Sequence, residues 1–148
     1  MQISMKCSVA VHCLIFIHEA SGIARVTSKL LAESTGSNPV VIRSILSALK
    51  KAGLITVPRG TGGAQLCADP AQITLFQIYS ALEPNGVTRL IGIHPCQDRP
   101  CPVAQNIYKV LQKPYKKIED AVQKAMESTT LQSMIDDFHA LVQQSANA

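Results

Sequence analysis

The segment HPCQDRPCPVAQN, residues 94–106, holds the side chains of this sequence that are best suited to chemistry. Four residues separate Cys96 from Cys101, His94 lies two positions before the first cysteine, and Asp98 lies between the two. Thiolate, imidazole and carboxylate groups can bind a metal, hold a cluster, form a disulfide or act as nucleophile and base. Which of these applies depends on the elements that position the segment.

A metal or iron–sulfur centre is short of ligands in this segment. A cluster needs about four ligands, largely thiolates, and here two cysteines are joined only by His94 and by Asp98 as a poor fourth donor. Zinc meets the same shortage, because the C-x4-C spacing has no second pair. We therefore predict no metal and no cofactor. An iron–sulfur cluster on Cys96, Cys101 and His94 is the alternative, and a disulfide between the two cysteines stays open because it depends on the loop geometry.

A single reactive thiol is the other reading of the segment. Cys101 precedes Pro102, where a helix is expected to begin, and unpaired N–H groups at a helix start favour a thiolate. Arg99 adds positive charge nearby. We predict that Cys101 is a redox-sensing thiol and that Cys96 belongs to the same site, against the alternative that Cys101 only caps the helix. Cys7 and Cys13 are expected in the core, where either could be a resolving partner, and Cys67 is expected to be structural.

An enzyme using Cys101 as nucleophile and His94 as base is a competing interpretation of the same residues. Nothing in the sequence orients the histidine, and no oxyanion site or substrate pocket is indicated. The chain is therefore predicted to have no catalytic residues and not to be an enzyme.

The composition predicts a mainly helical protein with an aliphatic core. Hydrophobic residues make up 47% of the 148 residues and aromatic ones only 4%, with no tryptophan. No cleavable signal follows the apolar residues near the start, and no apolar run approaches the roughly 18 residues of a membrane span. We expect a cytoplasmic protein with no membrane partner, and five cysteines in such a chain do not indicate a disulfide framework.

Positive charge is concentrated in the first half of the chain. Residues 1–68 hold seven Lys or Arg and two Asp or Glu, which gives +5, whereas residues 69–148 hold seven and eight, which gives −1. A basic half favours a polyanion as partner.

Two short helices joined by a glycine are predicted within this basic half. Thr27 can cap a helix over about 28–35, Gly36 supplies a turn, and Asn38 followed by Pro39 begins a second helix that runs to about residue 52. At 100° per residue, the second helix has an apolar side and a polar side without any acidic residue. The apolar side holds Val41, Ile42, Ile45, Leu49 and Ala52, and the other holds Val40, Arg43, Ser44, Ser47, Lys50 and Lys51.

The polar side of this second helix is predicted to contact DNA. Solvated helix faces usually mix both charge signs, and a wholly basic, hydroxyl-bearing face after a helix–turn–helix is typical of a recognition helix. Arg43 can bond a guanine edge and Val40 can pack on a thymine methyl group. Lys50 and Lys51 are expected to touch phosphate or solvent. A protein-interaction module without DNA is the competing function, and an acidic face would have favoured it.

A hairpin with a basic tip follows directly. The apolar run LITV at 54–57 and the run AQLCA at 64–68 flank the glycine-rich turn PRGTGG, which contains Arg59. The turn lacks the Lys-Ser/Thr ending and the following helix of a phosphate-binding loop. A hairpin in this position is a wing, and an arginine at its tip can enter a minor groove.

Three more helices are expected after the wing. Thr74 and Gln77 form a capping box at the start of a helix that ends near residue 83. Residues 103–128 are predicted to form a long helix that Pro114 kinks or splits. A last helix over about 131–142 carries a stripe of apolar residues, expected to be core within one subunit or across two.

Several of these segments resemble the Rrf2 family of bacterial winged-helix transcription regulators. The stretch VVIRSILSALKKAGLITVPRGTGGAQL followed by ITLFQIYSALE carries the family's helix ending, its RG..GG..L wing and its ITL..I..A.E helix. The segments NPVVIR and CPVAQNI resemble one branch of that family. Some members hold an iron–sulfur cluster on three cysteines between wing and long helix, a pattern that this chain does not meet.

The resemblance implies a homodimeric regulator that binds a palindromic operator, with its long helices paired across the two-fold axis. We expect this regulator to act as a repressor. It also implies three regions: a winged helix-turn-helix domain over 1–84, a linker and sensor loop over 85–103, and a helical dimerisation region over 104–148. Phosphate contacts are expected from Thr27 and Ser28. The predicted DNA-binding residues, with Ser47 added from the polar helix face, are Thr27, Ser28, Ser37, Asn38, Val40, Arg43, Ser44, Ser47, Arg59 and Gly60.

Overall fold

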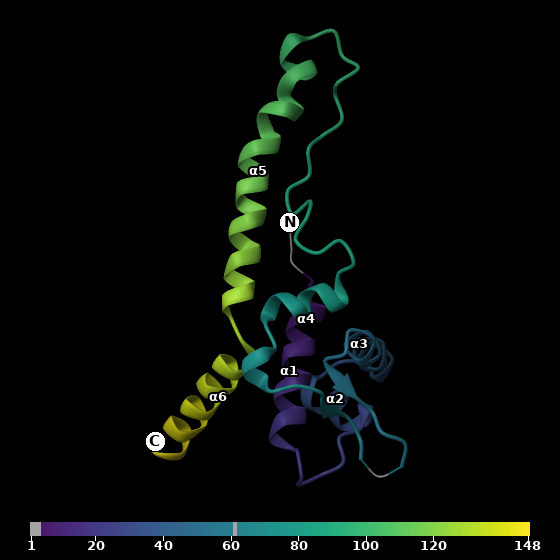
Figure 1. Ribbon diagram of the computed structural model, residues 1–148, viewed down its shortest axis with the longest axis vertical. Coiled ribbons are helices and arrows are strands. Elements are labelled where there is room, and N and C mark those ends of the chain that lie inside the picture. The colour runs from purple at the N-terminus through teal and green to yellow at the C-terminus, as the bar shows by residue number, and fades with distance from the viewer. Residues whose placement is uncertain (1–3, 61) are drawn as a thin grey trace.

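The computed structural model describes residues 4–60 and 62–148 and has the predicted fold class, mainly α with a small β-wing (Figure 1). One short sheet and a set of helices form a body from which a long helix projects, with the linker running beside it. The elements in chain order are α1 Met5–Glu19, α2 Ser28–Thr35, α3 Pro39–Lys51, β1 Ile55–Thr56, β2 Gln65–Leu66, the 3-10 turn η1 Pro70–Gln72, α4 Leu75–Leu82, α5 Pro102–Ser128 and α6 Leu131–Ala146.

Helix α1 lies at the centre of the body because it is apolar nearly all round. It contacts α2, α3, α4 and α6 as well as β2, and its buried side chains include Leu14 and Ile17. Cys7 and Cys13 are buried on it, as predicted for small core residues. Burial raises the pKa of Cys7 and raises that of Cys13 to about 11, so both thiols stay protonated near neutral pH.

The turn between α2 and α3 forms as its capping residues predict. The Oγ1 atom of Thr27 accepts a hydrogen bond from the backbone N–H of Leu30 (3.3 Å), and Oδ1 of Asn38 accepts one from the N–H of Val40 (2.8 Å). Gly36 ends α2 in the left-handed conformation, with φ of 68°. These caps fix how α3 leaves α2.

The predicted core stripe of α3 is correct only at its centre. Ile42, Ile45 and Leu49 are buried. Val41, 38% exposed, and Ala52 lie at the edges of the stripe and reach solvent. The contact of α3 with its neighbours is therefore narrower than the apolar sector predicted from its sequence.

The wing is an antiparallel pair in which Ile55 opposes Leu66 and Thr56 opposes Gln65. It is shorter than the two predicted runs, although the N–H of Cys67 still donates to the Leu54 carbonyl (3.1 Å). The prediction that Cys67 is structural is wrong for its side chain, which is exposed; only its backbone takes part in the hairpin. Thr61, in the predicted turn, lies outside the described residues.

Gly63 fastens the wing to the segment that precedes α2. Its φ is +64°, and a β-carbon there would lie 2.7 Å from both the N and O atoms of Val26. The N–H of Ala64 donates to that same Val26 carbonyl (3.1 Å). The close backbone approach holds the hairpin beside the start of α2.

Helix α4 begins with the predicted capping box. Thr74 Oγ1 accepts from the Gln77 N–H (3.2 Å), and Gln77 Oε1 accepts from the Thr74 N–H (2.9 Å). The helix ends at Leu82, one residue before its expected end. An isolated bridge joins Thr74 to Thr130, so the starts of α4 and α6 are held together.

The long helix α5 is continuous through Pro114, so the prediction that this proline splits it is wrong. Proline lacks the N–H that would bond the carbonyl four residues earlier, at Val110. Both residues are exposed on α5 in the single protomer, and the helix continues past Pro114 without this one bond. Figure 1 shows the first half of α5 extending beyond the helices of the body.

Helix α6 runs four residues beyond its predicted end and buries only the first part of its apolar stripe. Leu131 and Ile135 are buried, whereas Leu141 and Val142 reach solvent. His139 Nε2 lies 2.7 Å from Glu19 Oε1 and joins α6 to the end of α1. No helix of the described ranges is long and apolar enough to cross a membrane.

Candidate nucleic-acid interface

One side of α3 faces solvent and carries no negative charge. Arg43, Ser44 and Ser47 are exposed there, and Val40 is 63% exposed. An exposed valine beside an arginine and two hydroxyl groups provides one apolar and several polar contacts on one helix surface. These are the groups that read base edges in a major groove.

A hollow of about 300 Å³ lies where α2, α3 and the wing meet. Thr27 and Ser28 line it from the start of α2, Arg43 lines it from α3, and Gly63 lines it from the wing. The structure therefore brings three of the predicted site residues together: Thr27, Ser28 and Arg43. The free N–H groups at the start of α2 give this place a positive potential, which suits a phosphate.

Arg25 also lines the hollow and was missed at the level of sequence. Its side chain is exposed, and its Cγ atom would lie 3.0 Å from a β-carbon on Gly63. The sequence did contain a signal for Arg25, because a basic residue two positions before a helix cap must lie close to the start of that helix. The contact between Arg25 and Gly63 depends on the wing folding back, which no local sequence pattern shows.

Two of the predicted DNA-binding side chains are engaged in helix caps. Thr27 and Asn38 each accept a backbone N–H of the helix that they begin. The N–H of the half-buried Ser37 donates to Thr35 Oγ1 (3.3 Å). These bonds hold the turn that presents α3.

Arg59 and Gly60 lie in the exposed turn of the wing, with Gly60 at φ of +100°. Arg59 belongs to the same domain as Arg43, but it does not line the hollow between α2, α3 and the wing. The wing thus extends the basic surface beyond α3.

All five cysteines are free. Cys96 is half-buried, and its Sγ donates to the Ala104 carbonyl (3.4 Å). Cys101 is exposed at the N-cap of α5, as predicted, although its side chain makes no capping hydrogen bond. The backbone N–H groups of Ala104 and Val103 lower the pKa of the Cys101 thiol below its ordinary value.

The candidate metal donors do not gather. Across residues 4–60 and 62–148, no three His, Cys, Asp or Glu side chains come close enough to hold a metal ion. His94, Cys96, Asp98 and Cys101 therefore do not form a ligand set in this conformation, and these residues do not fit an iron–sulfur cluster.

A capped helix–turn–helix with an exposed basic second helix, followed by a hairpin fastened beside it, defines the class of winged-helix DNA-binding proteins. The particular family follows from comparison with known proteins. Residues 3–137 match the family Rrf2, described as iron-dependent transcriptional regulator. The chain belongs to the Rrf2 family of DNA-binding transcriptional regulators, as the sequence motifs predict.

Relatives agree with this assignment. The chain is 31% identical over 134 residues to YwnA of Bacillus subtilis (strain 168), an HTH-type transcriptional regulator by name, covering 90% of this chain and 97% of YwnA. This identity confirms the branch indicated by NPVVIR and CPVAQNI. A transcriptional regulator from Lactobacillus plantarum, again by name, superposes with a TM-score of 0.76 at 28% identity over 97% of each chain. CymR (YrzC) of B. subtilis shares the fold, with a TM-score of 0.66 at 24% identity over 92% of this chain and 97% of CymR.

Replacing Arg59 with alanine is expected to weaken operator binding and to reduce the slope of log K against log salt by about one. The arginine would neutralise one phosphate from the wing, and its loss removes about one released counterion. Fluorescence anisotropy between 50 and 200 mM salt measures the slope. Lys124→Ala, which removes one exposed cation on α5, is the matched control. Equal slopes for Arg59→Ala and wild type would remove Arg59 from the interface.

Proposed function

We propose that this protein is a cytoplasmic, homodimeric repressor that binds a palindromic operator and is controlled by oxidation of Cys101. The observation that carries the DNA-binding part is the convergence of Arg43, the start of α2 and the wing on one hollow. The three-region division, with a DNA-binding domain over 1–84, a linker over 85–103 and a dimerisation region over 104–148, is part of the proposal. A gel shift with the DNA upstream of the protein's own gene tests the proposed DNA binding. Footprinting on the same DNA is expected to show a protected site with two-fold symmetry.

The contacts with DNA divide by type. Arg43 bonds a guanine edge and Val40 packs on a thymine methyl group in the major groove. Thr27 and Ser28, with Arg25 beside them, hold a backbone phosphate at the start of α2. Arg59 enters the minor groove from the tip of the wing, where its charge also neutralises a neighbouring phosphate. The remaining contacts from the turn, from α3 and from the wing are assigned to Ser37, Asn38, Ser44, Ser47 and Gly60.

The homodimer is supported by an apolar stripe along α5 that the protomer leaves uncovered. At 100° per residue, seven apolar side chains fall within a sector of roughly 80°. Val103 is 68% exposed, Val110 62% and Ile118 43%. A stripe of this length on a projecting helix fits the same stripe of a second copy, since a two-fold contact is self-complementary. The stripe consists of Val103, Ile107, Val110, Pro114, Ile118, Ala121 and Ala125.

Replacing Val110 with aspartate is expected to raise the dimer dissociation constant at least about 100-fold, because each dimer would bury two unpaired carboxylates. Sedimentation equilibrium measures the constant. Lys109→Asp, which introduces the same charge on the polar side of α5, is expected to stay dimeric. A Val110→Asp protein that remains as dimeric as this control would show that the stripe is not the interface.

Thiol control is supported by the position of Cys101. Its sulfur is exposed at the start of the helix that is proposed to pair two subunits, and its pKa is lowered by backbone N–H groups. A thiolate in this place is open to oxidation to a sulfenic acid or a disulfide. Oxidation there would alter how the linker joins α5 and so the spacing of the two recognition helices.

Cys101 is expected to be the first cysteine alkylated by iodoacetamide. Its lowered pKa places its reactive thiolate at a lower pH than for an ordinary thiol, whereas Cys13, with a pKa of about 11, reacts only after unfolding. Peptide mass spectrometry across pH 6–9 follows the order in which the cysteines are alkylated.

In a gel shift, an oxidant is expected to change the DNA binding of the wild-type protein but not that of Cys101→Ser. An oxidant response that survives in Cys101→Ser would end the claim for this thiol, and Cys67→Ser is the control for an exposed cysteine elsewhere.

A further inference from the structure

We propose that the cavity between the linker and α5 binds an uncharged, planar aromatic molecule with oxygen substituents. The cavity, called the linker pocket below, has a volume of about 640 Å³ and is walled by Thr88, Arg89 and residues 91–93 of the linker on one side and by α5 on the other. Small-molecule sites commonly have this size and mix apolar walls with a few polar groups. The binding claim stands apart from DNA binding; only its regulatory consequence rests on the proposed function.

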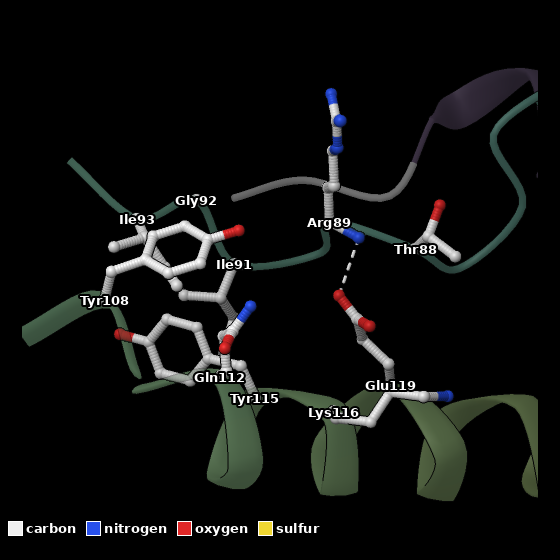
Figure 2. A pocket seen from close by; sticks show the side chains of 10 residues that line it. All are labelled: Thr88, Arg89, Ile91, Gly92, Ile93, Tyr108, Gln112, Tyr115, Lys116 and Glu119. Atoms are coloured by element: carbon white, nitrogen blue, oxygen red, sulfur yellow. Dashed lines mark hydrogen bonds between the residues drawn. The ribbon is translucent and has the colours of Figure 1, made fainter. Parts of the chain in front are cut away.

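The linker is held over α5 by a backbone contact. The N–H of Arg89 donates to Glu119 Oε1 (2.6 Å), drawn as the dashed line in Figure 2. Arg89 has φ of 63°, which is uncommon for a residue other than glycine. This conformation turns the linker so that the residues after Arg89 form the roof of the pocket.

The pocket has flat aromatic and aliphatic walls at one end. Figure 2 shows the rings of Tyr108 and Tyr115 on α5 facing Ile91 and Ile93 of the linker. Gly92 leaves the roof between the two isoleucines without a side chain. Two tyrosine rings and two branched aliphatic chains favour a planar aromatic ligand, which can stack on one and pack against the other.

The polar groups of the pocket favour a neutral ligand. The Tyr108 and Tyr115 hydroxyls and the Gln112 amide have no hydrogen-bond partner within the part of the chain that the structure describes, so they can bond hydroxyl or carbonyl oxygens. The charged groups are engaged or turned away: Glu119 accepts the Arg89 N–H, and Lys116 pairs with Asp120. In Figure 2 the Arg89 guanidinium points away from α5.

The linker pocket lies on a different side of α5 from the stripe proposed for the dimer. At 100° per residue, Tyr108, Gln112, Tyr115 and Glu119 are centred roughly 130° from that stripe. A second copy that covers Val110 and its neighbours therefore leaves the pocket to its own linker. A ligand in the pocket would join linker and α5 more firmly, which gives it a route to the two DNA-binding domains.

Titration with 2-naphthol tests the inference. Isothermal titration calorimetry measures the binding without an optical signal, because 2-naphthol absorbs in the range where tyrosine emits. A dissociation constant on the order of 0.1 mM is expected for a ligand of this size. Gln112→Leu is expected to weaken binding about fivefold and Tyr115→Leu about tenfold, while Gln123→Leu, on the same helix outside the pocket, leaves it unchanged.

Three results would overturn the inference: no binding of 2-naphthol, equal binding in the two pocket variants and wild type, or tighter binding of anionic 2-naphthoate than of 2-naphthol. A gel shift with the upstream DNA keeps the two proposals apart. Binding of 2-naphthol without DNA binding would contradict the proposed repressor and leave the pocket standing. DNA binding without 2-naphthol binding would contradict the pocket alone.

Discussion

Replacing Gly63 with alanine is expected to lower the free energy of unfolding by about 3 kcal/mol or more. The left-handed backbone at this glycine, with φ of +64°, costs an alanine about 1 kcal/mol. The added β-carbon would also lie 2.7 Å from two backbone atoms of Val26, closer than real β-carbons approach. Because the obstacle is backbone, the wing must move away, which breaks the hydrogen bond from the Ala64 N–H to Val26.

Gly36→Ala is the matched control for this change. Gly36 has nearly the same φ, +68°, but a β-carbon there meets nothing within 4 Å. Gly36→Ala should therefore lower the free energy of unfolding only by the cost of placing alanine in the left-handed conformation. Urea unfolding followed by circular dichroism measures both variants. If Gly63→Ala is no less stable than Gly36→Ala, the wing is not fastened to the segment before α2 as described.

Replacing Arg43 with alanine is expected to weaken operator binding by about 10- to 100-fold, the largest functional effect of any single change on α3. The side chain faces solvent on α3 and lines the hollow beside the start of α2. A bidentate bond to guanine accounts for about 1–3 kcal/mol of discrimination. Its loss should also relax specificity at one symmetric pair of base positions.

Anisotropy with a set of operators changed at one symmetric pair of positions at a time measures this. When the guanine that Arg43 reads is replaced, the affinity of the wild-type protein should fall. The affinity of Arg43→Ala for the same changed operator should differ little from its affinity for the unchanged one. Lys51→Ala, on the same helix, is the control for the loss of one positive charge. A uniform loss across all operators in Arg43→Ala would assign Arg43 to phosphate instead of a base.

The local features of the fold could be predicted because they depend on neighbours in the chain. The caps at Thr27 and Asn38 and the box formed by Thr74 and Gln77 each need one side chain and the next turn of the same helix. The order of helices and wing followed from these signals. Cys101 was placed at a helix start for the same reason, since Pro102 marks the first helical position.

What the sequence did not show depends on contacts between distant segments. The approach of Gly63 to Val26 joins residues 37 positions apart, and Arg25 lines the hollow beside this contact. The strand β2 is two residues long instead of the predicted five, and Cys67, directly after it, has an exposed side chain. Pro114 was expected to kink or split α5, yet the helix is continuous through it.

The direct test of the central claim, that this winged helix binds a specific operator, is the affinity of the wild-type protein for the DNA upstream of its own gene. The same measurement on a duplex of equal length and scrambled sequence, at physiological salt, gives the comparison. A ratio of at least about 1,000 in favour of the upstream DNA is expected, and Arg43→Ala should reduce that ratio about 10- to 100-fold. Equal affinity for the two duplexes would contradict it.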